Sequence, residues 1–383
     1  NVIFSSNSAD HYGGAIYNGG ELTIGHNVIF NSNSADSVGG AIANSGELTI
    51  GDNAIFSSNY AMDGGAIYNY NDGVITIGDN VLFSSNSADS VGGAIENYGE
   101  MSIGDNVIFS SNSANANGGA IINIGKLTTI GKNALFSSNF ANSLGGAIST
   151  IRELTFQDGA KFTNNVAVSS GGAIYNTDTL NLIANTNNIE FTGNTANGIS
   201  NAIHDGGGTI NLWAGKGSII FNDRITSENT TSVININQSS GTLPTTGTVI
   251  LNEDMEGFLG NVNFKSGKIQ LGNNGTLFNN FTVSNGATFD FADSVIKNYS
   301  FKNLTVSNGL ANITIDADLA NESMDTISAD NYSGTGKMDV NKINIITDST
   351  KINTDDVIFT TSTTLKDKIT ATTTAIGPLY NYN

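Results

Sequence analysis

Short runs of alternating apolar and polar residues recur along the first half of the chain at a nearly constant interval. Phe stands at positions 4, 30, 56, 83, 109, 136, 162 and 191, so successive steps are 26, 26, 27, 26, 27, 26 and 29 residues. Each of these Phe residues is followed three positions later by Asn, and a Gly-Gly-Ala-Ile motif begins about nine residues after each of the first seven. A third run, Leu-Thr-Ile-Gly at 22–25 in the first copy, precedes the next Phe. The pattern indicates an internal repeat of about 26 residues.

Each repeat holds three β-like runs separated by Gly, Asn, Asp and Ser, which are the residues typical of turns. No segment shows the 3.6-residue period of a helix. Three strands in about 26 residues cannot form a core of their own, so the repeats must stack and share one. Equivalent strands of successive repeats would then pair in parallel at about 4.8 Å. The repeat therefore predicts an all-β fold, a single-stranded parallel β-helix with three faces and about 26 residues per coil.

Such a solenoid assigns roles to the repeated residues. Leu22 and Ile24 share one face and should point inward, whereas Thr23 between them should face solvent. The Gly pair would allow a tight corner or a close approach of two backbones. Alternation alone does not decide whether the Ala or the Ile after it is buried. Phe and Asn are expected to form a structural ladder of stacked rings and paired amides. Its members are Phe4, Asn7, Phe30, Asn33, Phe56, Asn59, Phe83, Asn86, Phe109, Asn112, Phe136, Asn139, Phe162, Asn165, Phe191 and Asn194.

The repeat motifs stop near residue 205, where the eighth copy has decayed to Ser-Asn-Ala-Ile at 200–203. Strand-sized alternation persists beyond it, as in 209–213 and 248–251, and predicts a longer-coiled, less regular continuation of the β-helix over 206–359. From 360 to 383 the chain becomes Thr-rich with few apolar anchors, which indicates a terminal coil or a junction.

Composition and charge exclude several classes of protein. The 383 residues carry a net charge of −19, which disfavours nucleic acid and anionic membrane because their phosphates require clustered cations. The absence of Cys excludes a disulfide scaffold, a thiolate zinc site and a cysteine nucleophile. No apolar run approaches the ~18 residues of a membrane span, so we expect no direct membrane insertion. Residue 1 is Asn with no signal-like segment, as expected of a processed piece.

The recurrent Gly-Gly-Ala-Ile and Phe-x-x-Asn motifs resemble the polymorphic outer membrane protein repeats known from chlamydial surface proteins, over residues 1–205. The remainder, with Ser-Asn-Gly-Ala-Thr-Phe at 284–289 and Ile-Gly-Pro-Leu-Tyr at 376–380, is similar to the membrane-proximal passenger of autotransporters. The resemblance implies a right-handed β-helix exported by the type V route, located at the cell surface or outer membrane, that serves as an adhesin. Residues 360–383 would then lead toward a translocator barrel.

Candidate binding residues are the aromatic side chains expected to project outward, Tyr17, Tyr68 and Tyr175, which follow Ile in the Gly-Gly-Ala-Ile motif. Repeated exposed aromatic rings would give rigid anchors for a protein or a glycan. Turn residues His11, Tyr12, Tyr60 and Phe140 are further candidates.

Enzymatic and metal sites have weaker support. Asp52, Asp79 and Asp105 recur in one turn and could line up to bind Ca²⁺, but other coils have His26 and Lys132 there and the density of a calcium loop is missing. The three His residues have no metal-binding spacing. The outward Thr column that includes Thr23 is explained by the preference of β-branched residues for strands. We therefore expect no catalytic, cofactor or metal site.

The interpretation is a non-enzymatic bacterial surface adhesin whose partner is a host-cell receptor, a matrix protein or a glycan. The alternatives are a polysaccharide-active β-helix enzyme, which needs a site that breaks the repeat, and a structural stalk. Self-association through the coil ends is also expected, since a β-helix exposes unpaired strand edges there.

Overall fold

The structure is a computed structural model, and it describes residues 2–237, 246–272, 277–318, 321, 323–346, 363–376 and 381–382. The chain forms two compact units, Asn1–Ile210 and Asn211–Asn383. In the described part of the chain the single helix is a 3₁₀ turn, η1 (Thr363–Leu365), so the fold is all-β as predicted. No helix among these residues is long and apolar enough to cross a membrane.

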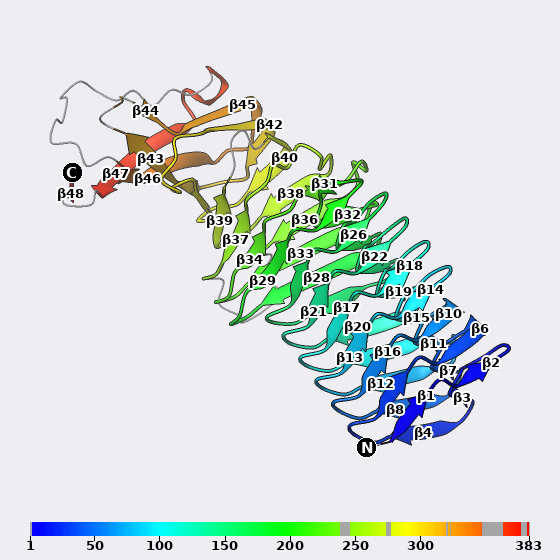
Figure 1. Cartoon of the computed structure of the whole chain (residues 1–383). Helices are drawn as coiled ribbons and strands as arrows, with labels where there is room; N and C mark the ends of the chain where they lie inside the picture. Colours follow the sequence, from blue (N-terminus) through cyan, green and yellow to red (C-terminus); the bar gives the residue numbers. More distant parts are fainter. Residues whose placement is uncertain are drawn as a thin grey trace. The chain divides into compact units, whose positions relative to one another are not determined.

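The first unit is a parallel β-solenoid whose strands follow one another in chain order from blue to green (Figure 1). Equivalent residues of successive coils pair with each other, as Phe4 does with Phe30 and Phe30 with Phe56. Because every coil repeats the same register, identical side chains stack in columns along the unit. The stacked parallel coils confirm the predicted β-helix.

Four parallel sheets run along this unit, each named here after its repeat motif. The Phe sheet contains β1 (Ile3–Ser5), β5 (Ile29–Asn31), β9 (Ile55–Ser57), β13 (Leu82–Ser84), β17 (Ile108–Ser110), β21 (Leu135–Ser137), β25 (Lys161–Thr163) and β29 (Ile189–Thr192). The Ser-Ala sheet contains β2 (Ser8–Ala9), β6 (Ser34–Val38), β10 (Tyr60–Asp63), β14 (Ser87–Ala88), β18 (Ser113–Ala114), β22 (Phe140–Ala141), β26 (Val166–Ala167), β30 (Thr195–Ala196) and the antiparallel β31 (Ile199–Ser200).

The other two sheets carry the remaining motifs. The GGAI sheet contains β3 (Ile16–Asn18), β7 (Ile42–Asn44), β11 (Ile67–Asn69), β15 (Ile95–Asn97), β19 (Ile121–Asn123), β23 (Ile148–Thr150), β27 (Ile174–Asn176) and β32 (Ile203–Asp205). The LTIG sheet contains β4 (Glu21–Ile24), β8 (Glu47–Ile50), β12 (Val74–Ile77), β16 (Glu100–Ile103), β20 (Lys126–Ile130), β24 (Leu154–Phe156) and β28 (Thr179–Ala184). Strand β33 (Thr209–Ala214) spans the boundary of the two units.

The prediction of three faces needs a correction, because the Ser-Ala sheet adds a fourth strand to each coil. Most of these strands have only two residues, too few to show any alternation in the sequence. They follow a turn in which Ser6 and its equivalents Ser32 and Ser58 have positive φ, near 55°. The turn after Phe therefore redirects the chain into a short strand instead of leading directly to the Gly pair.

The two glycines of each corner have different roles. The first, such as Gly118, has a φ of 67°, in the left-handed region that L side chains avoid. The second, such as Gly119, lies so close to the next coil that a Cβ would stand 2.1 Å from the carbonyl oxygen of Gly146. The Ala and the Ile that follow are both buried, as Ala120 and Ile121 are, so the corner buries two consecutive apolar side chains.

The second unit has two main parallel sheets. One contains β34 (Ile219–Phe221), β37 (Thr248–Leu251), β39 (Lys268–Leu271), β41 (Thr288–Asp290), β43 (Leu310–Asp318), β46 (Lys337–Ile345) and β47 (Ile369–Ile376). The other contains β36 (Val233–Ile236), β38 (Asn261–Phe264), β40 (Leu277–Val283), β42 (Asn298–Val306) and β45 (Thr326–Ser333). Short strands β35 (Ile225–Thr226), β44 (Ser323–Met324) and β48 (Asn381–Tyr382) complete it.

The coils of this unit vary in length. Ile219 pairs with Val249 after 30 residues and Ile313 with Val340 after 27, as expected of longer coils. Val249 pairs with Ile269 and Ile269 with Phe289, so each of these two turns takes only 20 residues. Among the described residues, these short turns use one strand from each of the two sheets and have no equivalent of the GGAI and Ser-Ala strands. In the predicted terminal segment, residues 363–376 form η1 and β47, which pairs with β46, whereas 360–362 and 377–380 lie outside the described residues.

Candidate functional site

The outer face of the GGAI sheet carries a column in which the side chain changes strongly from coil to coil. The column holds the middle residue of each three-residue strand, whose neighbours on both sides face the core, so it points away from the core. From the first coil to the eighth it consists of Tyr17, Ala43, Tyr68, Glu96, Ile122, Ser149, Tyr175 and His204. The three predicted tyrosines therefore occupy equivalent positions, but they are not neighbours.

Other tyrosines join two of them into one patch. The ring of Tyr12 lies 6.1 Å from that of Tyr17 and 6.4 Å from that of Tyr70, and the rings of Tyr70 and Tyr68 meet edge to face at 4.6 Å. Tyr98 follows at 5.8 Å from Tyr68. We call these five residues the tyrosine cluster. Tyr17 is 56% exposed, and Tyr68, Tyr70 and Tyr98 are half-buried, so the cluster offers ring faces to solvent on a fixed base.

An insertion in one turn brings an additional ring to this place. In the third coil the turn after β11 holds four residues, Tyr70 to Gly73, closed by a hydrogen bond from Gly73 N to Tyr70 O of 2.9 Å. The second coil has only Ser45 and Gly46 between its strands. This longer turn places Tyr70 between Tyr12 and Tyr68. Tyr175 lies apart from the cluster, where its ring stacks on that of His204 at 5.6 Å.

Glu96 is a buried carboxyl group beside the cluster. It pairs with Tyr68 across strands β11 and β15 and is only 2% exposed, and its Oε2 has no hydrogen-bond partner among the described residues. The pKa of Glu96 is raised to about 8, mainly by burial and also by the negative charge of Asp63. A hydrogen bond from Tyr98 opposes the rise. Burial and the Glu96 charge also raise the pKa of Tyr98, to about 12. Glu96 therefore remains protonated at neutral pH.

The repeat motifs of the first unit also match a known family model. The family model of the Chlamydia polymorphic membrane protein repeat matches residues 1–19, 27–45, 53–70, 80–98 and 160–177. These five segments are similar to the Chlamydia polymorphic membrane protein repeat, and together they cover less than half of the chain. Four of the five matches lie in the first four coils and contain all five residues of the tyrosine cluster. No curated protein matches the chain.

The repeat residues Phe and Asn lie in the interior of the solenoid. Adjacent rings of the eight-Phe column are 4.5 to 5.1 Å apart and nearly parallel. Each Asn from Asn7 to Asn165 donates Nδ2 to Oδ1 of the Asn in the next coil, at 2.8 to 3.0 Å. Phe4 and Asn7 in the first coil are half-buried, and the other members are fully buried. The Phe and Asn motifs therefore build the scaffold of the first unit.

A second amide ladder runs along the GGAI sheet and was missed by the sequence analysis. Asn18 donates Nδ2 to Oδ1 of Asn44, Asn44 to Asn69, and Asn69 to Asn97, at 2.8 to 2.9 Å. The Asn two residues after Ile in the polymorphic membrane protein motif was the signal that could have revealed it. Its side chains satisfy turn carbonyls between the GGAI and LTIG sheets, as Asn44 does with the carbonyl of Gly46 at 2.8 Å.

The Asp column considered for calcium has a backbone role. Oδ1 of Asp52 accepts the backbone N–H of Asp79 at 2.9 Å, and Oδ1 of Asp79 accepts that of Asp105 at 2.7 Å. His26 Nδ1 accepts the N–H of Asp52 in the same way at 3.0 Å, which explains why His replaces Asp in that turn. Within the described ranges, no three His, Asp or Glu side chains are placed to hold a metal ion.

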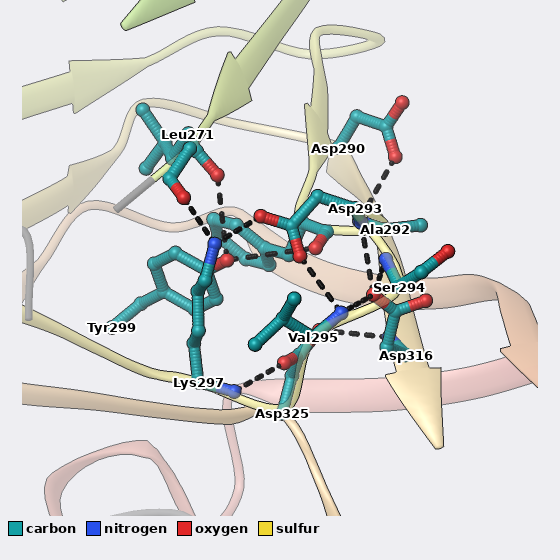
Figure 2. A network of polar contacts seen from close by, with 12 residues as sticks. Leu271, Asp290, Ala292, Asp293, Ser294, Val295, Lys297, Tyr299, Asp316 and Asp325 are labelled. Atoms are coloured by element: carbon teal, nitrogen blue, oxygen red, sulfur yellow. Dashed lines mark hydrogen bonds and ion pairs between the residues drawn. The ribbon is translucent and has the colours of Figure 1, made fainter. Parts of the chain in front are cut away.

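The second unit contains a buried network of charged groups (Figure 2). Lys297 lies buried with its Nζ bonded to Asp293 and to the carbonyl of Gly272. Oδ2 of Asp316 accepts the backbone N–H of Asp293 at 2.8 Å and that of Ser294 at 2.6 Å. Asp316 thus caps a turn in which Ser294 has a φ of 70°.

Asp325 connects this turn to the neighbouring strands. Its Oδ1 accepts the N–H of Lys297 at 2.8 Å, and its Oδ2 accepts that of Asp316 at 2.7 Å. Burial raises the pKa of Asp325 to about 7, although these two hydrogen bonds oppose the rise. Backbone donors and the Lys297 and Asn344 side chains bind these carboxyl groups, so we assign the network a role in stabilising an irregular part of the unit.

Proposed function

We propose that this chain is the passenger of a bacterial cell-surface autotransporter and acts as a non-enzymatic adhesin, with the tyrosine cluster as its contact surface. The single observation that carries the proposal is the cluster itself, five rings gathered on the outer face of the first four coils. The polymorphic membrane protein repeats support a place at the outer membrane and cell surface. The partner would be a host-cell receptor, a matrix protein or a glycan.

Tyrosine suits such a surface for energetic reasons. Its side chain has only two rotatable bonds and combines a large apolar face with a polar tip, so it gives contact area at a low cost in conformational entropy. Here the rings also support one another, and the hydroxyl of Tyr17 lies 3.2 Å from Oγ of Ser45. Binding of a partner would therefore cost little further side-chain entropy.

One observation favours the enzymatic alternative. Glu96 and Asp63 are two interacting carboxyl groups, and Glu96 has the raised pKa of a general acid. A polysaccharide hydrolase would use such a pair beside an aromatic platform. Against this, Glu96 is almost fully covered, whereas a catalytic acid has to reach the glycosidic oxygen. We therefore favour binding over catalysis.

The test is retention of the fluorescently labelled chain by epithelial cells and by immobilised glycans, with sugar release measured in parallel. Tyr17→Ser combined with Tyr70→Ser should reduce saturable retention by about tenfold or more, because central aromatic anchors dominate binding energy. Tyr175→Ser is the matched control, since Tyr175 occupies the same repeat position outside the cluster.

Other outcomes would decide between the alternatives. Sugar release that disappears in Glu96→Gln would establish the enzyme, and retention equal in all variants would remove the cluster from the contact. Lack of retention on every surface would leave the stalk as the better description. Self-association through the first coil, where Val2 and Ile3 are exposed, would appear in sedimentation velocity as oligomers that grow with concentration.

A further inference from the structure

The charge of the first four coils is entirely of one sign. Residues 1–125 contain twelve Asp and Glu residues and no Lys or Arg, and the first cation of the chain is Lys126. The tyrosine cluster lies wholly inside this stretch. Such a field attracts cations to the face and repels phosphate and sulfate groups.

Acidic groups also stand directly beside the rings. Asp63 ends strand β10 next to the Gly corner, and its charge raises the pKa values of both Tyr68 and Tyr98. Glu96 lies between these two tyrosines in sequence and pairs with Tyr68 in the sheet. The backbones of Tyr68 and Glu96 are therefore about one strand spacing apart, about 4.8 Å, which places a buried carboxyl group beside the rings.

We infer that the tyrosine cluster receives the side-chain cation of a lysine or arginine on a protein partner, and that Glu96 beneath it becomes the counter-ion. The inference deepens the proposed adhesin function by naming the chemical class that the contact surface recognises. Aromatic ring faces attract an ammonium or guanidinium group, and a nearby carboxylate strengthens that attraction when water is excluded. A neutral glycan would gain no affinity from the excess of negative charge in this stretch or from the unpartnered Oε2 of Glu96.

Cation binding should be coupled to loss of a proton. In the free protein Glu96 is neutral at pH 7, since its pKa is about 8. The titratable groups that face it are Asp63, Tyr68 and Tyr98, and no Lys or Arg is among them. A cation within about 4–6 Å lowers a carboxyl pKa by about 1–3 units, so at pH 7 the Glu96 proton leaves to solvent as the partner binds.

The experiment titrates the whole chain with an acetylated and amidated octapeptide of four alternating Gly-Lys pairs by isothermal calorimetry. Measurement at pH 7 in two buffers of different ionisation enthalpy counts the protons released, and the same peptide with acetylated lysines is the ligand control. We expect binding of the lysine peptide with release of roughly one proton per site, and binding at least about tenfold weaker once the lysines are acetylated.

Two pairs of variants make the result specific. Glu96→Gln should abolish proton release, whereas Glu47→Gln, which removes an exposed carboxylate from the same stretch, should retain it. Tyr68→Leu should weaken the peptide about tenfold, and Tyr175→Leu, at the same repeat position, should not. Thermal melts check that each variant folds, and Tyr98→Phe, which keeps the ring, provides a milder second test and should retain binding.

The outcomes separate this inference from the adhesin function. Equal binding of lysine and acetyl-lysine peptides, or proton release that persists in Glu96→Gln, overturns the cation site. Cell retention that is unchanged in Glu96→Gln and in Tyr68→Leu overturns it as well, while the adhesin function stands. Peptide binding with proton release but no cell retention supports the cation site and removes the adhesin function.

Discussion

Replacing Phe109 with Ala tests the interior column of the solenoid at its middle. The Phe109 ring is fully buried and lies between Phe83 at 4.7 Å and Phe136 at 4.8 Å, with interplanar angles of 3° and 5°. Truncation of a buried Phe costs about 3–5 kcal/mol. We expect the upper end, about 5 kcal/mol, because two ring contacts are lost at once and the amide ladder holds the neighbouring coils apart, so the cavity cannot collapse.

The assay is urea denaturation followed by circular dichroism, and the chain offers a matched control. Phe140 lies one coil further on and is 39% exposed, so Phe140→Ala should change the free energy of unfolding by less than about 1 kcal/mol. Phe4→Ala should fall between the two, since Phe4 stacks on one neighbour only and is half-buried. Equal denaturation midpoints for the variants at 109 and 140 would refute both the inward orientation of the Phe column and its contribution to stability.

Three further predictions concern charge, backbone and the second unit. For Glu96→Gln we expect stability equal to wild type at pH 4 and greater by up to about 5 kcal/mol at pH 9. The reason is that the wild-type carboxyl group ionises near pH 4.5 in the unfolded chain and near pH 8 in the folded chain. Urea midpoints across this pH range measure the difference in stability, and a difference that does not change with pH would contradict the prediction. Gly119→Ala should lower the melting temperature strongly through its clash with the next coil, whereas Gly20→Ala, with open space around it, should be neutral. Lys297→Met should destabilise the second unit by up to about 3 kcal/mol, because it leaves the largely covered carboxylate of Asp293 without its cation. Unchanged hydrogen-exchange protection in β42 would count against this.

Much of the first unit follows from spacing alone. Phe and Asn at a constant interval fix the register of every coil, and register fixes which side chains stack. The Gly pair similarly required a corner of special backbone geometry, and the structure uses one glycine for positive φ and the other for close approach. These features repeat, so each copy reinforces the same interpretation.

The tyrosine cluster could not be derived from the spacing of residues in the sequence. Tyr12, Tyr70 and Tyr98 stand at turn positions that differ from coil to coil, and only the folded chain brings them beside Tyr68. Burial of Glu96 on an outward position was equally hidden, because alternation predicts direction but not what the flanking turns cover. The network around Lys297 joins residues far apart in the sequence, most of them in turns between strands, with no local signal in the sequence.

The regular register makes the coils of the first unit interchangeable. The first five coils offer the same Phe ring, the same two ladder amides and the same Gly corner to their neighbours, so removing a whole repeat among them joins two surfaces that already match. A gene encoding such repeats can lose or gain copies by unequal recombination without inventing a new interface. The outward column then changes its order of side chains while the scaffold stays intact, which lets surface variation proceed separately from folding.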